Sequence, residues 1–156
     1  RMIAYDYIKE NAIDTNTYYF DEKYIDEHNI FKATHDAMHK VLDGLNVIPD
    51  HILVDGKYFY SYRNNDMVIP HTCIEKGDNT YCSIAAASIL AKVERDKYIY
   101  DMCDRYPDLD TYFDLRSNKG YGTKKHMEGL NNHGVSGWHR LSFEPCSNKD
   151  IITMDN

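Results

Sequence analysis

The sequence has no long hydrophobic run and no paired-cysteine motif, and both absences narrow its class. A membrane-spanning helix needs about 18 or more consecutive apolar residues, and no segment approaches that length, so we expect no membrane contact. The first residues are not a signal peptide, because Asp6 interrupts any apolar core. None of the four cysteines belongs to a Cys-x-x-Cys pair. We therefore expect reduced thiols, with disulfides as the alternative. We also expect a cytoplasmic location, with a nuclear or viral-factory setting as the alternative.

Positive charge is also scarce in the chain as a whole. The net charge of −7 argues against a protein held to nucleic acid by bulk charge alone. The charge is unevenly distributed, however: residues 1–30 hold three basic and seven acidic side chains, whereas residues 116–140 hold five basic and one acidic. A local basic patch of this kind can bind phosphate groups on an acidic protein.

The apolar pattern predicts one α/β domain in which strands alternate with helices. A chain of 156 residues fits a single domain. Helices are expected over residues 1–13, 26–42, 83–100 (with Ser83 as N-cap) and 123–133. Strands are expected over residues 17–20, 51–55 (closed by Gly56) and 68–74, and a polar turn over residues 60–67. We expect residues 101–118 to be irregular or partly helical with a break at Pro107, and residues 146–156 to be a mobile tail after a domain of residues 1–145.

Three aspartates are candidates for metal binding. Asp55 ends a buried strand and precedes Gly56, the position where open α/β sheets place their sites, although an ordinary Asp-Gly turn explains the pair equally well. Asp78 could be a second metal carboxylate, but a turn or cap role is favoured without a partner. Asp96 lies within a helix, where an ion pair with Lys92 four residues earlier is an equally good explanation.

The loop from Lys119 to Thr123 is the more specific binding candidate. Its two glycines let the backbone approach a ligand, and they hold Tyr121 between them ahead of a helix N-terminus; a turn with a packed tyrosine is the alternative. The nearby His126, His133 and His139 could contact phosphate or simply lie on the surface. His35 and His39 are four residues apart on one helix, but a solvated face is favoured there over a metal pair.

Five segments resemble motifs of the ribonuclease HII family, and they follow the family's order from about residue 1 to 145. The longest is Gly77–Asp96, which begins Gly-Asp-Asn-Thr-Tyr-Cys-Ser. The other four are Ile25–Thr34 (IDEHNIFKAT), Leu53–Gly56 (LVDG), Lys119–Thr123 (KGYGT) and His139–Phe143 (HRLSF). The related ribonuclease HIII is less similar, because its equivalent of the long motif reads differently.

The resemblance implies a ribonuclease H-like fold with a C-terminal helical region. It also implies an endonuclease that cleaves the RNA strand of RNA–DNA hybrids, or single ribonucleotides in duplex DNA, with two Mg²⁺ or Mn²⁺ ions. Asp55 and Asp78 match two of four metal carboxylates, Tyr121 matches the tyrosine that senses the 2′-hydroxyl, and Asp96 matches a residue we expect to be structural rather than a metal ligand. Lys119 and Arg140 are expected to contact substrate, and the complete protein is expected to be a monomer.

This sequence lacks one motif of the family, the Asp-Glu-Ala-Gly-Arg-Gly that carries the other two carboxylates on the first strand. We therefore expect an N-terminally truncated domain, weak metal binding and no cleavage by this chain alone. A catalytically inactive hybrid-binding fragment is the alternative function. The apolar strand at Ile52–Val54 suits a sheet interior, so loss of the first strands should leave it with an unpaired edge.

Overall fold

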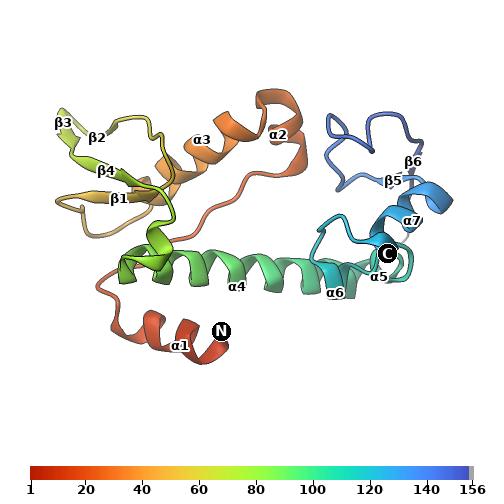
Figure 1. The fold of residues 1–156 in the computed structure, drawn as a ribbon, viewed down its shortest axis with the longest axis horizontal. Helices are drawn as coiled ribbons and strands as arrows, with labels where there is room; N and C mark the ends of the chain where they lie inside the picture. Colours follow the sequence, from red (N-terminus) through yellow and green to blue (C-terminus); the bar gives the residue numbers. More distant parts are fainter. Residues whose placement is uncertain (155–156) are drawn as a thin grey trace. The chain divides into compact units, whose positions relative to one another are not determined.

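The computed structural model describes residues 1–154, which form two compact units (Figure 1). The first unit consists of residues 1–19 and 31–94, and the second of residues 20–30 and 95 onward. The long helix α4 (Cys82–Arg105) contributes residues to both. Each unit is described by itself below, and the single domain over residues 1–145 stays a prediction.

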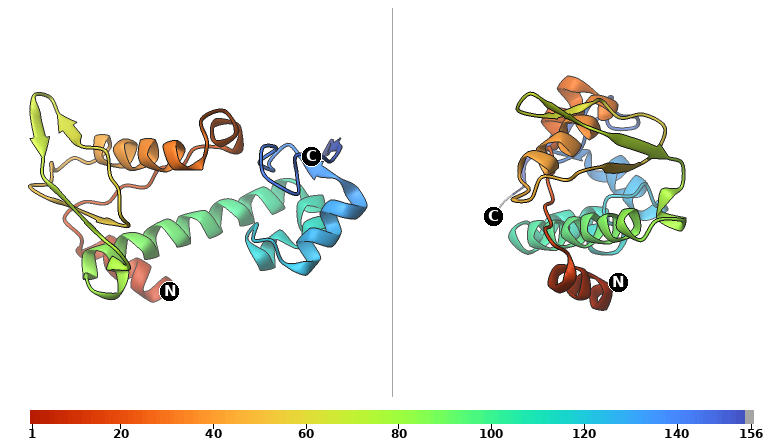
Figure 2. Two further views of the ribbon diagram at one scale, coloured as in Figure 1. Left: turned by 45° about the horizontal axis from the view of Figure 1, so that its top comes forward. Right: turned by 90° about the vertical axis from the view of Figure 1, so that its left-hand side faces the viewer.

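The first unit contains two small sheets (Figure 2). In one, β1 (Ile52–Asp55) and β4 (His71–Ile74) are parallel, with Asp55 opposite Ile74. In the other, β2 (Tyr62–Asn64) and β3 (Met67–Ile69) form an antiparallel hairpin. The helices are α1 (Met2–Asn11), most of α3 (Ile30–Asp43), the short 3₁₀ helix η1 (Gly77–Asn79) and the first half of α4.

The first unit has two apolar clusters. Strand residues Ile52, Val54, Tyr62 and Ile69 make one, with Met38 and Leu42 of α3 packed against it. Tyr5 of α1 packs with Leu90 and Val93 of α4 in the other. Within the described residues β1 pairs only with β4, so its second edge has no strand neighbour there.

The second unit is mainly helical. It contains α2 (Glu22–His28), the second half of α4, α5 (Pro107–Phe113), α6 (Leu115–Asn118), α7 (Lys124–His133) and a parallel pair of two-residue strands, β5 (Val135–Ser136) and β6 (Ile151–Ile152). Its core joins side chains from all of the helices except α2, and from β5: Ile99, Met102, Cys103, Leu109, Phe113, Leu115, Leu130, Val135 and Cys146. Phe113, Leu109 and Val135 have no exposed surface.

Several predicted elements are confirmed. The first helix, the strand at Ile52–Asp55 and the break at Pro107 lie where the sequence placed them, since proline is favoured in the first turn of a helix. Helix α7 begins after Thr123, whose hydroxyl accepts the N–H of His126, and ends at Gly134 with φ of 92°. The helix expected over residues 123–133 is therefore confirmed to within one residue at its start.

Other predicted elements are wrong. Residues 17–20 form no strand, and the helix expected over residues 26–42 is divided at Asn29, whose φ of 66° is left-handed. The polar segment 60–67 contains β2 and the turn of the β2–β3 hairpin at Asn65, also with positive φ, because asparagine tolerates that conformation. The one strand expected over residues 68–74 is divided between β3 and β4, which belong to different sheets. Helix α4 begins at Cys82, so Ser83 lies inside it and is not its cap, and residues 101–118 are largely helical.

Residues 146–154 of the predicted mobile tail pair and pack in the structure. Cys146 is buried, and β6 pairs with β5 through Val135 opposite Ile151. The mobility of this segment stays a prediction, and residues 155–156 lie outside the described residues. All four cysteines are free, as expected.

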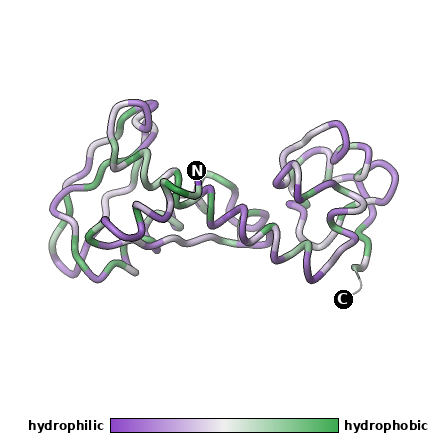
Figure 3. Tube along the Cα trace, turned by 90° about the horizontal axis from the view of Figure 1, so that it is seen from below, coloured by the Kyte–Doolittle hydropathy of each residue, from purple (hydrophilic) through white to green (hydrophobic). Residues whose placement is uncertain are grey.

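Hydrophilic and hydrophobic stretches are interleaved along the chain (Figure 3). Over residues 1–154 the structure has no helix that combines the length and the apolar character needed to cross a membrane.

The contact between α5 and α7 depends on Gly129. A Cβ added there would lie far inside van der Waals distance of the Tyr112 carbonyl and 2.9 Å from the ring of Phe113. We expect Gly129→Ala to lower the free energy of unfolding by about 1–3 kcal/mol, although alanine is favoured over glycine in helices by about 1 kcal/mol. Urea denaturation measures the change. The matched control is Gly137→Ala, where an added Cβ meets nothing within 4 Å, and equal stability of the two variants would contradict the prediction.

Candidate functional site

Asp55 is the last residue of β1, and its side chain is exposed. The N–H of Gly77 donates to its Oδ1 at 2.9 Å. Gly56 follows with φ of 128°, a conformation that L-residues rarely adopt, so the chain turns away directly after the carboxylate. This bond joins the end of the strand to the segment that carries the second predicted aspartate.

Asp78 lies in η1, next to the residue that Asp55 binds, and it is also exposed. Lys76 begins this turn in the left-handed region at φ of 55°, and Gly77 is buried against Ile84 and Ile74. A Cβ at Gly77 would lie 2.5 Å from the Ile84 side chain, so only glycine fits without rearrangement. The structure thus places the two predicted aspartates on adjacent, tightly connected segments of the first unit.

The carboxylates of Asp55 and Asp78 are of the ligand type that hard divalent cations prefer. Mg²⁺ and Mn²⁺ prefer oxygen ligands, which both side chains offer on an exposed sheet edge. In the part of the chain that the structure describes, however, no group of three or more Asp, Glu, His or Cys side chains could hold a metal ion. The two carboxylates therefore have the right chemistry for a divalent cation, but they are fewer ligands than a complete metal site needs. Asp96 is half-buried on the part of α4 that belongs to the second unit, and its structural role stays a prediction.

His35 and His39 of α3 both contact backbone carbonyl groups of the loop that follows β1. Nε2 of His35 lies 3.2 Å from the Tyr58 carbonyl, and Nε2 of His39 lies 2.9 Å from that of Tyr60. His35 is buried, so the predicted solvated face is wrong at this position.

Tyr121 presents its ring to solvent on a loop of the second unit whose backbone is firmly held. Its side chain is 68% exposed, while its N–H donates to the Asn118 carbonyl at 2.9 Å. The buried Asn118 side chain accepts the Gly120 N–H at 2.8 Å and donates to the Phe113 carbonyl at 2.6 Å. Gly120 has φ of 79°, which favours glycine. The turn alternative with a packed tyrosine does not describe this ring, because it is exposed.

Two cations lie beside the loop. The Arg95 guanidinium donates to the Lys119 carbonyl at 2.6 Å, and its centre is 5.6 Å from the Tyr121 ring centroid. The Lys119 ammonium lies 4.1 Å from the ring centroid of Tyr100 and bonds the Arg116 carbonyl. Of the two predicted substrate contacts, Lys119 is thus directed toward α4 and α6.

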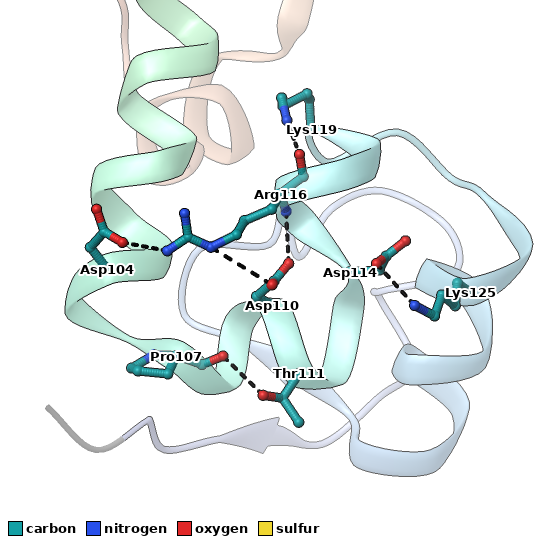
Figure 4. A network of polar contacts seen from close by, with 8 residues as sticks. All are labelled: Asp104, Pro107, Asp110, Thr111, Asp114, Arg116, Lys119 and Lys125. Atoms are coloured by element: carbon teal, nitrogen blue, oxygen red, sulfur yellow. Dashed lines mark hydrogen bonds and ion pairs between the residues drawn. The ribbon is translucent and has the colours of Figure 1, made fainter.

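Much of the basic charge between residues 116 and 125 is paired internally (Figure 4). Arg116 contacts Asp104 and lies 3.7 Å from a carboxylate oxygen of Asp110, and the hydrogen bond to Asp104 raises the pKa of the guanidinium. Lys125 pairs with Asp114 at 3.0 Å. These pairs are exposed, where ion pairs contribute little to stability, so they organise the loop surface rather than strengthen the fold.

Arg140, the other predicted substrate contact, is exposed with its guanidinium 3.9 Å from the ring centroid of Phe143. Its turn is held by Asp26, which accepts the N–H groups of Leu141 at 2.7 Å and Ser142 at 3.0 Å, and the Ser142 hydroxyl at 2.5 Å. Partial burial opposes ionisation of Asp26, but the bonds from Ser142 and Leu141 and the charge of Arg140 outweigh it, so the pKa lies below its ordinary value. Sequence reasoning missed this residue, although it lies within one of the recognised segments.

The predicted residues are divided between the units. Asp55 and Asp78 belong to the first, whereas Asp96, Lys119, Tyr121 and Arg140 belong to the second. The candidate residues therefore form two candidate part-sites, an acidic one in the first unit and an aromatic and basic one in the second.

Comparison with known proteins identifies the class. A sequence model of the family described as Ribonuclease HII matches residues 1–146. The chain is 46% identical over 119 residues to Ribonuclease HII of Phocaeicola vulgatus, covering 76% of this chain and 55% of the relative. It is 44% identical over 137 residues to Ribonuclease HII of Christiangramia forsetii, covering 88% and 65%. The corresponding values for Ribonuclease HII of Listeria innocua are 42% over 145 residues, 93% and 52%.

The chain belongs to the ribonuclease HII family, as its motifs indicated. It spans about half to two thirds of the length of the curated relatives it matches.

The Asp26 contacts make the Arg140 turn sensitive to acid. We expect Asp26→Asn to lower the free energy of unfolding by about 1 kcal/mol at pH 7, because the charged acceptor of three hydrogen bonds is lost. Because the folded pKa lies below the ordinary 3.8, this stabilisation is complete above about pH 3.8 and is lost as pH falls through the folded value.

Thermal unfolding of wild type and variant between pH 7 and pH 2.5 should therefore show two curves that converge in acid. Glu27→Gln removes a charge from a neighbouring side chain that is 77% exposed and serves as the control. A stability difference that stays constant down to the lowest pH would contradict the assignment.

Proposed function

We propose that the protein is an endoribonuclease that cleaves the RNA strand of RNA–DNA hybrids and single ribonucleotides embedded in duplex DNA. The observation that carries the proposal is the exposed Tyr121 ring on a loop whose backbone is fixed by Asn118 and Arg95. Such a ring can lie against a sugar or base without first ordering its loop. Family membership and the Asp55–Asp78 pair support the same conclusion.

The proposed reaction is hydrolysis of a phosphodiester bond, with Asp55 and Asp78 as ligands of divalent cations. Two Mg²⁺ or Mn²⁺ ions, when bound, would activate water and stabilise the leaving 3′-oxygen. The chain's own contribution is to hold one oxygen of Asp55 toward Gly77 and so fix the orientation of the carboxylate at the strand end. Residues 1–156 supply two of the four carboxylates that the resemblance implies, so we expect this chain alone to bind metal weakly and not to cleave.

Selection of RNA is proposed to come from the 2′-hydroxyl, the group that distinguishes RNA from DNA at a given site. Tyr121 would contact the ribose at the RNA–DNA junction. Arg140 and Lys119 would contact phosphates, which position a nucleic acid without reading its sequence. We further propose that both units are parts of one ribonuclease H-like domain, in which β1 and β4 belong to a larger sheet. A monomer in the cytoplasm fits this role.

The acidic part-site is tested by Asp55→Asn in the intact protein, meaning a protein that also carries the segment with the other two carboxylates. The carboxamide keeps an oxygen that can accept the Gly77 N–H but removes the negative charge, so folding should be preserved while cleavage falls at least about a hundredfold. Cleavage of an RNA–DNA hybrid in the presence of Mg²⁺ and the melting temperature are the two measurements.

Asp50→Asn is the matched control for this test, because Asp50 is exposed just before the same strand. Asp78→Asn should behave like Asp55→Asn. If Asp78→Asn instead lowers the melting temperature and leaves turnover intact, Asp78 is a structural turn residue, and near wild-type turnover of Asp55→Asn would end its assignment as a metal ligand.

The aromatic part-site is tested by Tyr121→Ala. We expect cleavage at a single ribonucleotide to fall about tenfold more than cleavage within a long hybrid, because a long hybrid offers other sites of engagement. The measurement is the ratio of kcat/KM for the two substrates. Tyr7→Ala, at an equally exposed tyrosine of α1 (66%), should leave the ratio unchanged. Equal losses of Tyr121→Ala on both substrates would mean that the ring only completes the loop.

A further inference from the structure

A chain of hydrogen bonds crosses the second unit from β5 to the Tyr121 loop. The Ser136 N–H donates to Nδ1 of His139 at 3.1 Å, and Nε2 of His139 lies 3.0 Å from Nε2 of His126. Nδ1 of His126 in turn lies 3.2 Å from the Tyr121 carbonyl oxygen. The carbonyl of Tyr121 is thus connected, through two imidazoles, to a serine with no exposed surface.

The donor at one end determines the direction of every bond. Nδ1 of His139 also lies 2.8 Å from the Ser136 Oγ, a contact that could run in either direction. The backbone N–H of Ser136 can only donate, so Nδ1 of His139 accepts and carries no proton, and the Ser136 hydroxyl is the donor to the same nitrogen. The proton of neutral His139 is then on Nε2, which donates to His126. Nε2 of His126 therefore accepts, and its proton is on Nδ1, which donates to the Tyr121 carbonyl.

The surroundings keep both rings neutral. Burial lowers the pKa of His139 to about 4, with a further contribution from His126, and burial also lowers the pKa of His126. The ring of Phe113 packs against both, with centroids 4.8 Å from His139 and 5.7 Å from His126. The nearby cations are directed elsewhere: Lys125 to Asp114, and Arg140 to the ring of Phe143. At neutral pH the directed chain is thus the stable arrangement.

We propose that His126 and His139 are positioning residues for Tyr121: His126 holds the Tyr121 carbonyl with its Nδ1–H, and His139 selects the tautomer that makes this possible. The Tyr121 ring itself is exposed, so the backbone is what these contacts can fix. The bonds from Asn118 and Arg95 hold the backbone on the N-terminal side of Tyr121. With a glycine on each side, the peptide that carries the Tyr121 carbonyl would otherwise have considerable freedom. The only other donor to this carbonyl within the described residues is the Thr123 N–H at 2.8 Å. The link to substrate selection rests on the function proposed above.

The first test requires no substrate. Nitrogen-15 NMR of the intact protein at pH 7 should show His126 as the Nδ1–H tautomer and His139 as the Nε2–H tautomer. Free imidazole side chains favour Nε2–H, so the result for His126 is diagnostic. An Nε2–H tautomer at His126, or a charged ring at either position, would overturn the proposal whatever the protein cleaves.

The second test uses a matched pair of variants. The amide nitrogen of asparagine can occupy the position of Nδ1, whereas that of glutamine reaches the position of Nε2. We therefore expect His126→Asn to keep the bond to Tyr121 and His126→Gln to lose it. The ratio of kcat/KM for a single ribonucleotide over a long hybrid should stay within about twofold of wild type in His126→Asn and fall about fivefold or more in His126→Gln.

A structural role alone would affect both variants equally. Their melting temperatures are compared for this reason, and exchange of the Thr123 amide, which donates to the same carbonyl, should be accelerated in His126→Gln but not in His126→Asn. Equal behaviour of the two variants in ratio and exchange would overturn the positioning role. If exchange separates the pair while Tyr121→Ala leaves the substrate ratio unchanged, the anchoring stands and the assignment of Tyr121 to substrate selection is the part that fails.

Discussion

The backbone of residues 118–123 is fixed from several directions, and the properties of the second unit's part-site depend on this constraint. Asn118 is buried and uses its side chain for Gly120 and Phe113, while Arg95 holds the Lys119 carbonyl. The bonds to Gly120 and Lys119 involve backbone atoms of the loop, and the bond to the Phe113 carbonyl anchors the Asn118 side chain, so the Tyr121 ring is exposed on a loop whose backbone is held. A binding group that is ordered in advance loses less entropy when its ligand arrives.

The acidic part-site follows the same principle in a simpler form. Asp55 uses one oxygen to receive the Gly77 N–H, and this bond positions the strand end against the turn that carries Asp78. Gly77 can lie this close to Ile84 because it has no side chain: a Cβ there would be 2.5 Å from the Ile84 side chain. The interaction connects segments 22 residues apart in sequence, so a carboxylate that looks like part of a local Asp-Gly turn is in fact held by a tertiary contact.

Charge pairing changes how the basic region is understood. From composition, residues 116–140 form a patch ready for phosphate. In the structure Arg116 and Lys125 are paired with aspartates, and Lys124 lies 3.7 Å from a carboxylate oxygen of Glu128. Lys119 bonds the Arg116 carbonyl, and Arg140 is stacked on Phe143, so most of the basic side chains of this region already have partners within the chain. Exposed ion pairs are weak, and nucleic acid phosphates could compete with the aspartates for these cations.

Local signals in the sequence determined the features that one segment can encode alone. The strand at Ile52–Asp55, the cap at Thr123 and the end of α7 at Gly134 follow from apolar patterning, a hydroxyl and a glycine within a few residues. The motifs also sufficed to predict the family, while the roles of Asp55, Asp78 and Tyr121 stay predictions. Only the tertiary structure decided that Asp26 holds the turn of Ser142, 116 residues away, and that His139 and His126 form a chain to Tyr121. These contacts join residues whose own neighbours carry no mark of the partner, because a hydrogen bond depends on proximity that packing of the whole unit creates.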